Sequence, residues 1–359
     1  MKPNYAVGII IGLTLVVLNQ VSIRNMPQKK LSFIIVNYTT KGLIEKNITN
    51  LLNSWDNCEI IFVDNDSPDG SADFVEEKFG NESKVRLIRS QNRGLASGYN
   101  QGLKICTGDY IVYLGTDAFP TRDVLDSMVS YMDENTDVGI ATPKLYLRDG
   151  SIDLDAHRGF PTPWVSLTHF SYLDRLFPKS KLFNGYSRKY EDFNSIHQID
   201  ACISHFMFVR PEVHKKIGTW DEDYFLYGED IDFCYRAKEA GYKVMYLGNL
   251  KVLHYKGASV GRDTASDIEN AMNTDFDQIS FKGHVYKKDA EKSKNGKSGF
   301  STKTWMKIKI SKESTKAMKT FYNKHFAKKY PFFVNWFVLF GINVNEFIRT
   351  LKVFMESFR

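Results

Sequence analysis

The sequence LSFIIVN occupies residues 31–37, and EIIFVD follows at residues 59–64. Both runs are short, apolar and rich in β-branched residues, which is typical of strands buried on both faces of a sheet. Between them, residues 43–55 place apolar side chains at helical spacing. Further strands are predicted at 85–88 and 110–114, with helices at 72–79 and 95–106. This alternation predicts an α/β fold with a Rossmann-like, mostly parallel sheet flanked by helices.

Ligands of such sheets bind beyond the carboxyl ends of the strands, so the polar residues there are the candidates for a site. Four groups stand at these places: Asp64-Asn65, Gln91 to Gly94, Gly115 to Asp117, and Gly228 to Asp232, which opens a helix predicted at 233–240. A single Asp after a strand is usually a turn former or a helix cap. Several carboxylates that meet at one sheet edge require a cation or a shifted protonation state.

Seven segments, taken in order over about residues 31–260, resemble glycosyltransferase family 2, whose members have the GT-A fold. The rhamnosyltransferase-like branch is the most similar. The matching segments are FIIVNY (33–38), IFVDNDSPDGS (61–71), QNRGLASGYNQG (91–102), GDYIVYLGTD (108–117), RGFPTP (158–163), DEDYFLYGEDIDFCYR (221–236) and HYKGAS (254–259). One such motif alone is weak, whereas the ordered set is specific.

The resemblance implies transfer of a sugar from a nucleotide-diphosphate-sugar donor, with inversion, to a hydroxyl of a glycan or lipid-linked glycan. Rhamnose is the sugar that the branch suggests. The diphosphate leaving group is negatively charged, so a divalent cation, Mg²⁺ or Mn²⁺, is expected to stabilise it. Inversion by a single displacement also needs one base for the acceptor hydroxyl.

The resemblance assigns the metal to Asp117 and His254. Asp117 ends the motif that corresponds to D-x-D, but Gly115 stands where the family has a first carboxylate or amide. One ligand is therefore lost, and metal dependence is left open. The alternative for His254 is a strand-end histidine bonded to the backbone.

The same resemblance assigns the base to Asp230, at the start of a helix, where a carboxylate is electrostatically favoured. Glu229, counted among the substrate-binding residues, and Asp232 are supports; for both, complementation of the helix N-terminus is the alternative. The nucleotide is assigned to Asn37, Tyr38, Asp64, Asn92 and Arg93. Tyr38 is alternatively a packing residue, and Arg93 a surface residue.

An aromatic-rich segment at residues 148–197 interrupts the alternating pattern. In this fold class the corresponding region faces the acceptor, and aromatic faces suit sugars or lipids. A second small core is the alternative. The aromatic residues are Trp164, Phe170, Tyr172, Phe177, Phe183, Tyr186, Tyr190 and Phe193.

The two ends of the chain differ from the body. Residues 1–26 hold an apolar run, interpreted as a marginal anchor, an interfacial helix or a leader absent from the working protein. Residues 27–265 are predicted to form the GT-A domain. Residues 266–359 are predicted to be a lysine-rich linker and a membrane-associating helical tail. Residues 282–329 carry 15 Lys and three acidic residues, although the whole chain has a net charge of only +6.

The basic tail and its aromatic run at 332–344 have the composition of a segment that lies among lipid headgroups. A helix packed on the body is the alternative. With Arg24, Lys29 and Lys30 following the N-terminal run, the positive-inside rule predicts a location at the cytoplasmic face of a membrane, peripheral or through one anchor.

Three other classes of protein are weighed against this prediction. A sugar nucleotidyltransferase needs a glycine-rich basic loop after the first strand, and residues 37–42 offer only Lys41 and Gly42. Nucleic acid is not an expected partner, because the lysine-rich tail lacks interleaved aromatic residues and any recognisable module. A non-catalytic nucleotide- or glycan-binding protein of the same fold remains an alternative because of Gly115.

Overall fold

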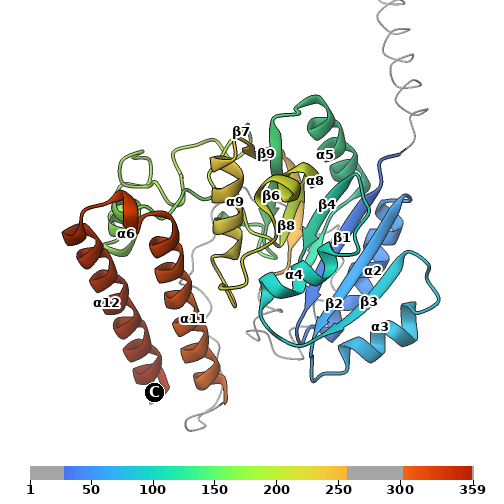
Figure 1. The fold of residues 1–359 in the computed structure, drawn as a ribbon, viewed down its shortest axis with the longest axis horizontal. Helices are drawn as coiled ribbons and strands as arrows, with labels where there is room; N and C mark the ends of the chain where they lie inside the picture. Colours follow the sequence, from blue (N-terminus) through green and yellow to red (C-terminus); the bar gives the residue numbers. More distant parts are fainter. Residues whose placement is uncertain (1–27, 257–301, 358–359) are drawn as a thin grey trace, which may run out of the picture.

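The computed structural model describes residues 28–256 and 302–357. Within them, nine strands form one sheet in the order β3-β2-β1-β4-β8-β6-β9-β5, and β7 pairs with β9 at the side. The strands are β1 (Leu31–Asn37), β2 (Cys58–Asn65), β3 (Val85–Ser90), β4 (Tyr110–Leu114), β5 (Ala118–Phe119), β6 (Val138–Tyr146), β7 (Ile196–Gln198), β8 (Phe206–Val209) and β9 (Lys243–His254). Figure 1 shows this sheet between helices and, beside it, a helical C-terminal pair.

The half of the sheet that holds β3, β2, β1 and β4 is parallel, as the sequence pattern predicts. The rest is mixed: β8 runs antiparallel to both β4 and β6, whereas β6 and β9 are parallel. The order β3-β2-β1-β4 is that of doubly wound α/β sheets. In such sheets ligands bind where the strand order reverses, which here is beyond the carboxyl ends of β1 and β4.

The helices cover both faces of the sheet, and each face has its own apolar core. α2 (Lys41–Ser54), α3 (Ser71–Phe79) and α5 (Arg122–Glu134) pack on one face, where Ile44, Val75 and Leu125 are buried. α4 (Leu95–Leu103), α8 (Pro211–Ile217) and α9 (Glu229–Glu239) pack on the other, which is visible in Figure 1. The predicted α/β class is therefore confirmed.

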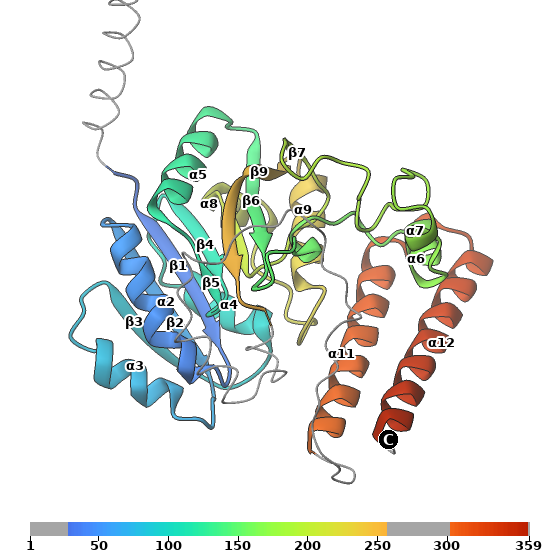
Figure 2. The same ribbon diagram turned by 180° about the vertical axis from the view of Figure 1, so that it is seen from behind.

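The C-terminal extension is a helical hairpin of α11 (Thr302–His325) and α12 (Phe332–Ser357). Figures 1 and 2 show the two helices side by side, next to α9 and to α6 (Pro163–Phe170) and α7 (Leu173–Leu176). Phe321 and Tyr322 of α11, and Phe326 directly after it, belong to the same buried cluster as residues of α9. The predicted helical extension is confirmed, while the division into domains at residue 265 stays a prediction.

Polar contacts also fasten α11 to the sheet domain. His325 Nε2 lies 2.6 Å from Asp232 Oδ1, and Arg236 Nε donates to Asp232 Oδ2 over 2.7 Å. Lys324 pairs with both Asp221 and Asp223. Asp232, predicted as a support of the site, therefore joins α9 to the C-terminal hairpin.

Candidate active site

The carboxyl ends of β1, β2 and β4 carry a linked set of polar side chains. Asn37 Nδ2 donates to Asp64 Oδ1 over 2.7 Å, and the second Asp64 oxygen accepts from the backbone N–H of Ser67 at 2.9 Å. Thr40 Oγ1 bonds to Asn37 Oδ1 and lies 2.9 Å from Thr116 Oγ1. Asn37, Asp64 and the residue next to Asp117 are thus brought into one hydrogen-bond network, as expected for a common sheet edge.

The loop 91–94 closes over the end of β2. Asn65 Nδ2 donates to the Gly94 carbonyl over 3.1 Å, and Asn92 Oδ1 accepts from Gly94 N at 3.2 Å. Gly94 has φ +101°, and a Cβ there would lie 2.4 Å from the Phe225 carbonyl, so only glycine fits. Asn92 therefore shapes this loop, next to Asp64.

Two residues predicted to bind nucleotide have solvent-facing side chains. Arg93 is exposed, and its Nη2 bonds to the neighbouring Gln91 Oε1 at 3.3 Å. Tyr38 follows β1 with 39% of its surface exposed, so it does not pack in the core. Their roles in ligand binding stay predictions.

Asp117 is completely buried, and neither of its carboxylate oxygens has a hydrogen-bond partner among the described residues. His254 Nε2 faces Asp117 Oδ1 at 3.6 Å, and His254 Nδ1 lies 2.8 Å from Asp153 Oδ2. Ligand atoms of Asp117, His205 and His254 all lie within 4.8 Å of one another. A buried carboxylate without partners beside two imidazoles fits a divalent cation.

The electrostatics of this group favour a cation as well. Burial alone would lower the pKa of His254, but the Asp117 and Asp153 carboxylates outweigh it and raise the pKa to about 9. Burial opposes ionisation of Asp117, yet His254 and His205 lower its pKa below the usual value. Asp117 and Asp153 therefore stabilise positive charge at the position of His254. Asp153, which orients His254, also pairs with Lys256 at 2.6 Å.

Asp230 lies in the first turn of α9, which begins at Glu229, four residues earlier than the sequence predicts. Gly228 caps this helix with φ +84°. Arg158 Nη2 donates to Asp230 Oδ2 over 2.6 Å, and Asp230 Oδ1 accepts the N–H of Ile231 at 2.7 Å. The neighbouring Glu229 is buried; burial and the Asp230 charge raise its pKa to about 8.

The charges of Asp117 and of the first turn of α9 both act on Tyr99. Burial chiefly raises the pKa of its hydroxyl, and the charges of Glu229, Asp230 and Asp117 add to the increase. The pKa of His205 likewise responds to Asp117, His254, Asp153 and Asp230, although burial dominates and lowers it. Asp117 and Asp230, 113 positions apart in sequence, therefore act on common neighbours.

Sequence reasoning alone missed three residues of this site. Arg158 lies in a segment that matches the family, but its ion pair with Asp230 depends on a contact between distant segments. Asp153 and His205 lie outside the matching segments and carry no local signal. Only the sheet pairing of β4 with β8 and of β5 with β9 brings His205 and His254 to Asp117.

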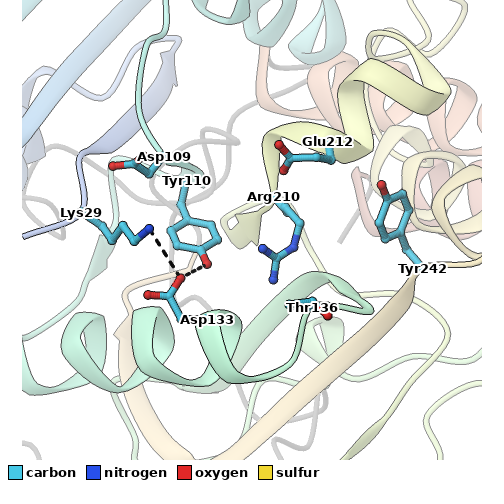
Figure 3. Close-up of a pocket in the computed structure, with 8 residues that line it drawn as sticks. All are labelled: Lys29, Asp109, Tyr110, Asp133, Thr136, Arg210, Glu212 and Tyr242. Carbon is cyan, nitrogen blue, oxygen red and sulfur yellow. Dashed lines mark hydrogen bonds and ion pairs between the residues drawn. The ribbon is translucent and has the colours of Figure 1, made fainter.

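A separate pocket opens at the opposite ends of the strands. Figure 3 shows it near Lys29, Tyr110, which begins β4, and Asp133 of α5. Tyr110 OH donates to Asp133 Oδ1 over 2.6 Å, and Arg210 Nη2 donates to the Met132 carbonyl at 2.5 Å. These polar groups bind one another, which is typical of a structural network, and none of the predicted site residues lines this pocket.

The fold is an α/β sheet domain with a cluster of polar and carboxylate side chains beyond its parallel strands. The model of glycosyl transferase family 2 matches residues 32–218, more than half of the chain, and the protein belongs to this family. The predicted GT-A type of α/β fold is confirmed with it.

Individual relatives are distant. The chain is 26% identical over 132 residues to the putative glycosyltransferase EpsH of Bacillus subtilis, a match that covers 36% of this chain and 38% of that protein. It is 32% identical over 113 residues to an uncharacterized glycosyltransferase of Haemophilus influenzae. That match covers 31% of this chain and 44% of that protein. The chain thus spans less than half the length of these two relatives.

A third relative is the N-acetylglucosaminyl-diphospho-decaprenol L-rhamnosyltransferase of Mycobacterium tuberculosis, 24% identical over 221 residues, covering 58% of this chain and 70% of that protein. It agrees with the predicted rhamnosyltransferase-like branch. Among solved structures, the chain is similar to GalNAc-T7 with UDP, GalNAc and Mn²⁺, with a TM-score of 0.48 and 14% identity. The match covers 66% of this chain and 47% of that one. The chain is also similar to the mannosyltransferase PcManGT of Pyrobaculum calidifontis in complex with GDP-Man and Mn²⁺. The TM-score is 0.45 and the identity 14%, and the match covers 91% of this chain and 88% of that one.

Proposed function

We propose that the protein is an inverting, cation-assisted glycosyltransferase that moves a sugar from a nucleotide-diphosphate-sugar to a hydroxyl of a lipid-linked or other glycan. One observation carries the proposal: the buried, unpartnered carboxylate of Asp117 faces His254 at the same sheet edge that holds Asp64. Membership of glycosyl transferase family 2 supports the class of reaction.

The nucleotide belongs beyond the ends of β1 and β2. Asp64 and Asn37 offer an acceptor and a donor that suit a ribose or base edge, and the 91–94 loop covers them. Arg93, exposed beside this loop, is in a position to meet phosphate in bidentate fashion.

Asp117 and His254 would hold the cation, which when bound stabilises negative charge that develops on the departing diphosphate. Asp153 fixes the His254 ring through Nδ1, which leaves Nε2 directed at Asp117. Burial keeps water away from this position, so the interaction with charge is stronger than it would be in solvent.

Asp230 takes the proton from the acceptor hydroxyl as that oxygen attacks the anomeric carbon. Its Oδ2 is held by Arg158, which fixes the orientation of the carboxylate. Glu229 next to it has a pKa raised to about 8 by burial first and by Asp230 second, so it is protonated at neutral pH. Asp230 is thus the one base that a single displacement needs.

A membrane surface is the proposed location of the acceptor. α12 presents an exposed apolar face, in which Trp336 is 60%, Phe337 65% and Phe347 67% exposed. α6 packs against α12 and adds exposed Trp164 and Leu167, so the face is continuous across two segments. Among the described residues, no helix combines the length and apolarity needed to cross a membrane. Lys328, exposed just before α12, suits anionic headgroups.

The rhamnosyl donor and a lipid-linked acceptor are supported by the name of the mycobacterial relative. Residues 1–26, predicted as an anchor, interfacial helix or leader, lie outside the described residues. The cytoplasmic face stays a prediction from the charge distribution.

The first test is a thermal-shift panel of nucleoside diphosphates and their sugars, with and without Mn²⁺. We expect a cation-dependent shift for one nucleotide, followed by transfer to a lipid-linked glycan extract with inversion of the anomeric configuration by NMR. A non-catalytic binding protein, which Gly115 keeps under consideration, would bind the nucleotide sugar and yield no transferred or hydrolysed sugar. No shift with any nucleotide would contradict both.

A further inference from the structure

We propose that His205 replaces the carboxylate that Gly115 lacks, so that Asp117, His205 and His254 form a two-histidine, one-carboxylate cation site. The inference rests on the proposed function, because the cation is the one expected to assist the leaving diphosphate. It adds a ligand that the family motif does not supply, and it explains how the chain retains a third ligand without a first acidic residue in its D-x-D position.

The space next to Gly115 is already filled by His205. A Cβ built on Gly115 would lie 2.6 Å from His205 Cδ2 and 2.7 Å from Asp117 Oδ1, both closer than real Cβ contacts. The backbone holds the two residues together, since Gly115 N donates to the His205 carbonyl over 3.0 Å next to the paired Leu114 and Phe206. A side chain at 115 and the imidazole at 205 therefore exclude each other.

His205 is also chemically free to bind an ion. Its Nδ1 is buried and has no hydrogen-bond partner among the described residues, as is true of both oxygens of Asp117. The His205 and His254 rings lie with centroids 5.2 Å apart, and one ligand atom from each joins Asp117 within 4.8 Å. Unpartnered polar atoms on Asp117 and His205, close to a His254 ring that Asp153 holds in place, are the pattern of a ligand set.

Two imidazoles and one carboxylate change which ion the site prefers. Mg²⁺ favours oxygen ligands, whereas imidazole nitrogen suits transition-metal ions. Replacing a carboxylate by His205 should therefore move the preference from Mg²⁺ towards Mn²⁺ and later first-row ions. We expect Mn²⁺ to bind at least tenfold more tightly than Mg²⁺, in the absence of nucleotide.

The test measures Mn²⁺ binding to the full chain directly, by electron paramagnetic resonance and by calorimetry. It uses no activity readout. His205→Ala should weaken Mn²⁺ binding at least tenfold and leave Mg²⁺ binding nearly unchanged. His197→Ala is the matched control, because His197 belongs to the other histidine–carboxylate cluster, with His157 and Glu191. It should leave Mn²⁺ binding unaltered.

The double variant Gly115→Asp with His205→Ala should restore cation binding with a preference shifted towards Mg²⁺, because loss of the ring leaves only the end of the Asp117 side chain within 3 Å of the new Cβ. Gly115→Asp alone should bind no better than wild type and should be less stable. If His205→Ala does not fold, electron spin-echo modulation of Mn²⁺ bound to wild type decides: two imidazole nitrogens support the proposal, and one overturns it.

The outcomes separate this proposal from the wider one. Wild-type Mn²⁺ affinity in His205→Ala, together with loss of binding in Asp117→Asn, would remove His205 and leave the proposed cation site standing. Unchanged affinity in Asp117→Asn and His254→Ala would overturn the site itself.

Discussion

Arg158 and Asp230 form an ion pair across 2.6 Å, and each is more than nine-tenths buried. The pair joins the segment after β6 to the first turn of α9. Arg158 orients the buried Asp230 carboxylate through Oδ2, and Oδ1 accepts the N–H of Ile231. This is the state that a base for an acceptor hydroxyl requires before substrate arrives.

Asp230→Asn should lower the rate of sugar transfer about 10²- to 10⁴-fold, because an amide cannot take the acceptor proton. Binding of the nucleoside diphosphate should change little, since Asp230 lies apart from the Asp64 network. Transfer kinetics and calorimetry on the same preparation measure the two effects. A variant that keeps full transfer activity would exclude Asp230 as the base.

Arg158→Met should destabilise the fold by about 3–5 kcal/mol, because it leaves the Asp230 charge buried and unpaired. The double variant Arg158→Met with Asp230→Asn should lose less, as the unpaired charge is gone. Denaturant unfolding of the wild type and the three variants gives the coupling energy. Additive losses would mean that the two side chains do not depend on each other.

His214 predicts a pH dependence of stability. Its Nδ1 lies 3.0 Å from the Gly218 carbonyl, its Nε2 lies 2.7 Å from Tyr113 OH, and burial lowers its pKa from 6.5 to about 4. The unfolded chain binds the proton more readily between these values, so stability should fall as pH drops from 6.5 to 4, by about 3 kcal/mol.

His214→Gln removes this titration, so the difference between wild type and variant isolates it from other groups. The free energy of unfolding, measured by urea at several pH values, should fall less steeply in the variant below pH 6.5. Parallel curves would show that His214 is not held neutral in the fold.

The apolar face of α12 should bind anionic vesicles. Trp336→Glu and Phe340→Glu each place a charge where an aromatic ring is more than half exposed, so each should weaken binding to phosphatidylglycerol-containing vesicles by about tenfold or more. Ile196→Glu is the control, because Ile196 is 44% exposed on β7, away from this helix. Equal binding by all of these variants would argue against a membrane role for α12.

The parallel half of the sheet could be predicted from the sequence, because runs such as residues 31–37 and 59–64 are apolar on both faces and end in turn residues. The antiparallel half could not, since β8 is only four residues long and its neighbours are distant in sequence. The same limit applies to the site. Asp64, Asp117, Asp230 and His254 stand at strand or helix ends within recognisable segments, whereas the partners Arg158, Asp153 and His205 depend on long-range pairing.

The sequence pattern places the start of α9 too late because Glu229, Asp230 and Asp232 are polar, and helical periodicity is visible only from Phe233 onward. Buried charge at a helix N-terminus breaks the usual apolar pattern, and its compensation by Arg158 is invisible in the local sequence.

α11 shares its core with α9, the helix whose first turn carries the proposed base, and His325 of α11 bonds to Asp232 of α9. A surface that covers α12 would therefore hold Asp230 at a fixed distance from that surface and in a fixed orientation. Acceptors would then be sorted by how far their reactive hydroxyl projects from that surface, so glycan length itself would become a criterion of selection.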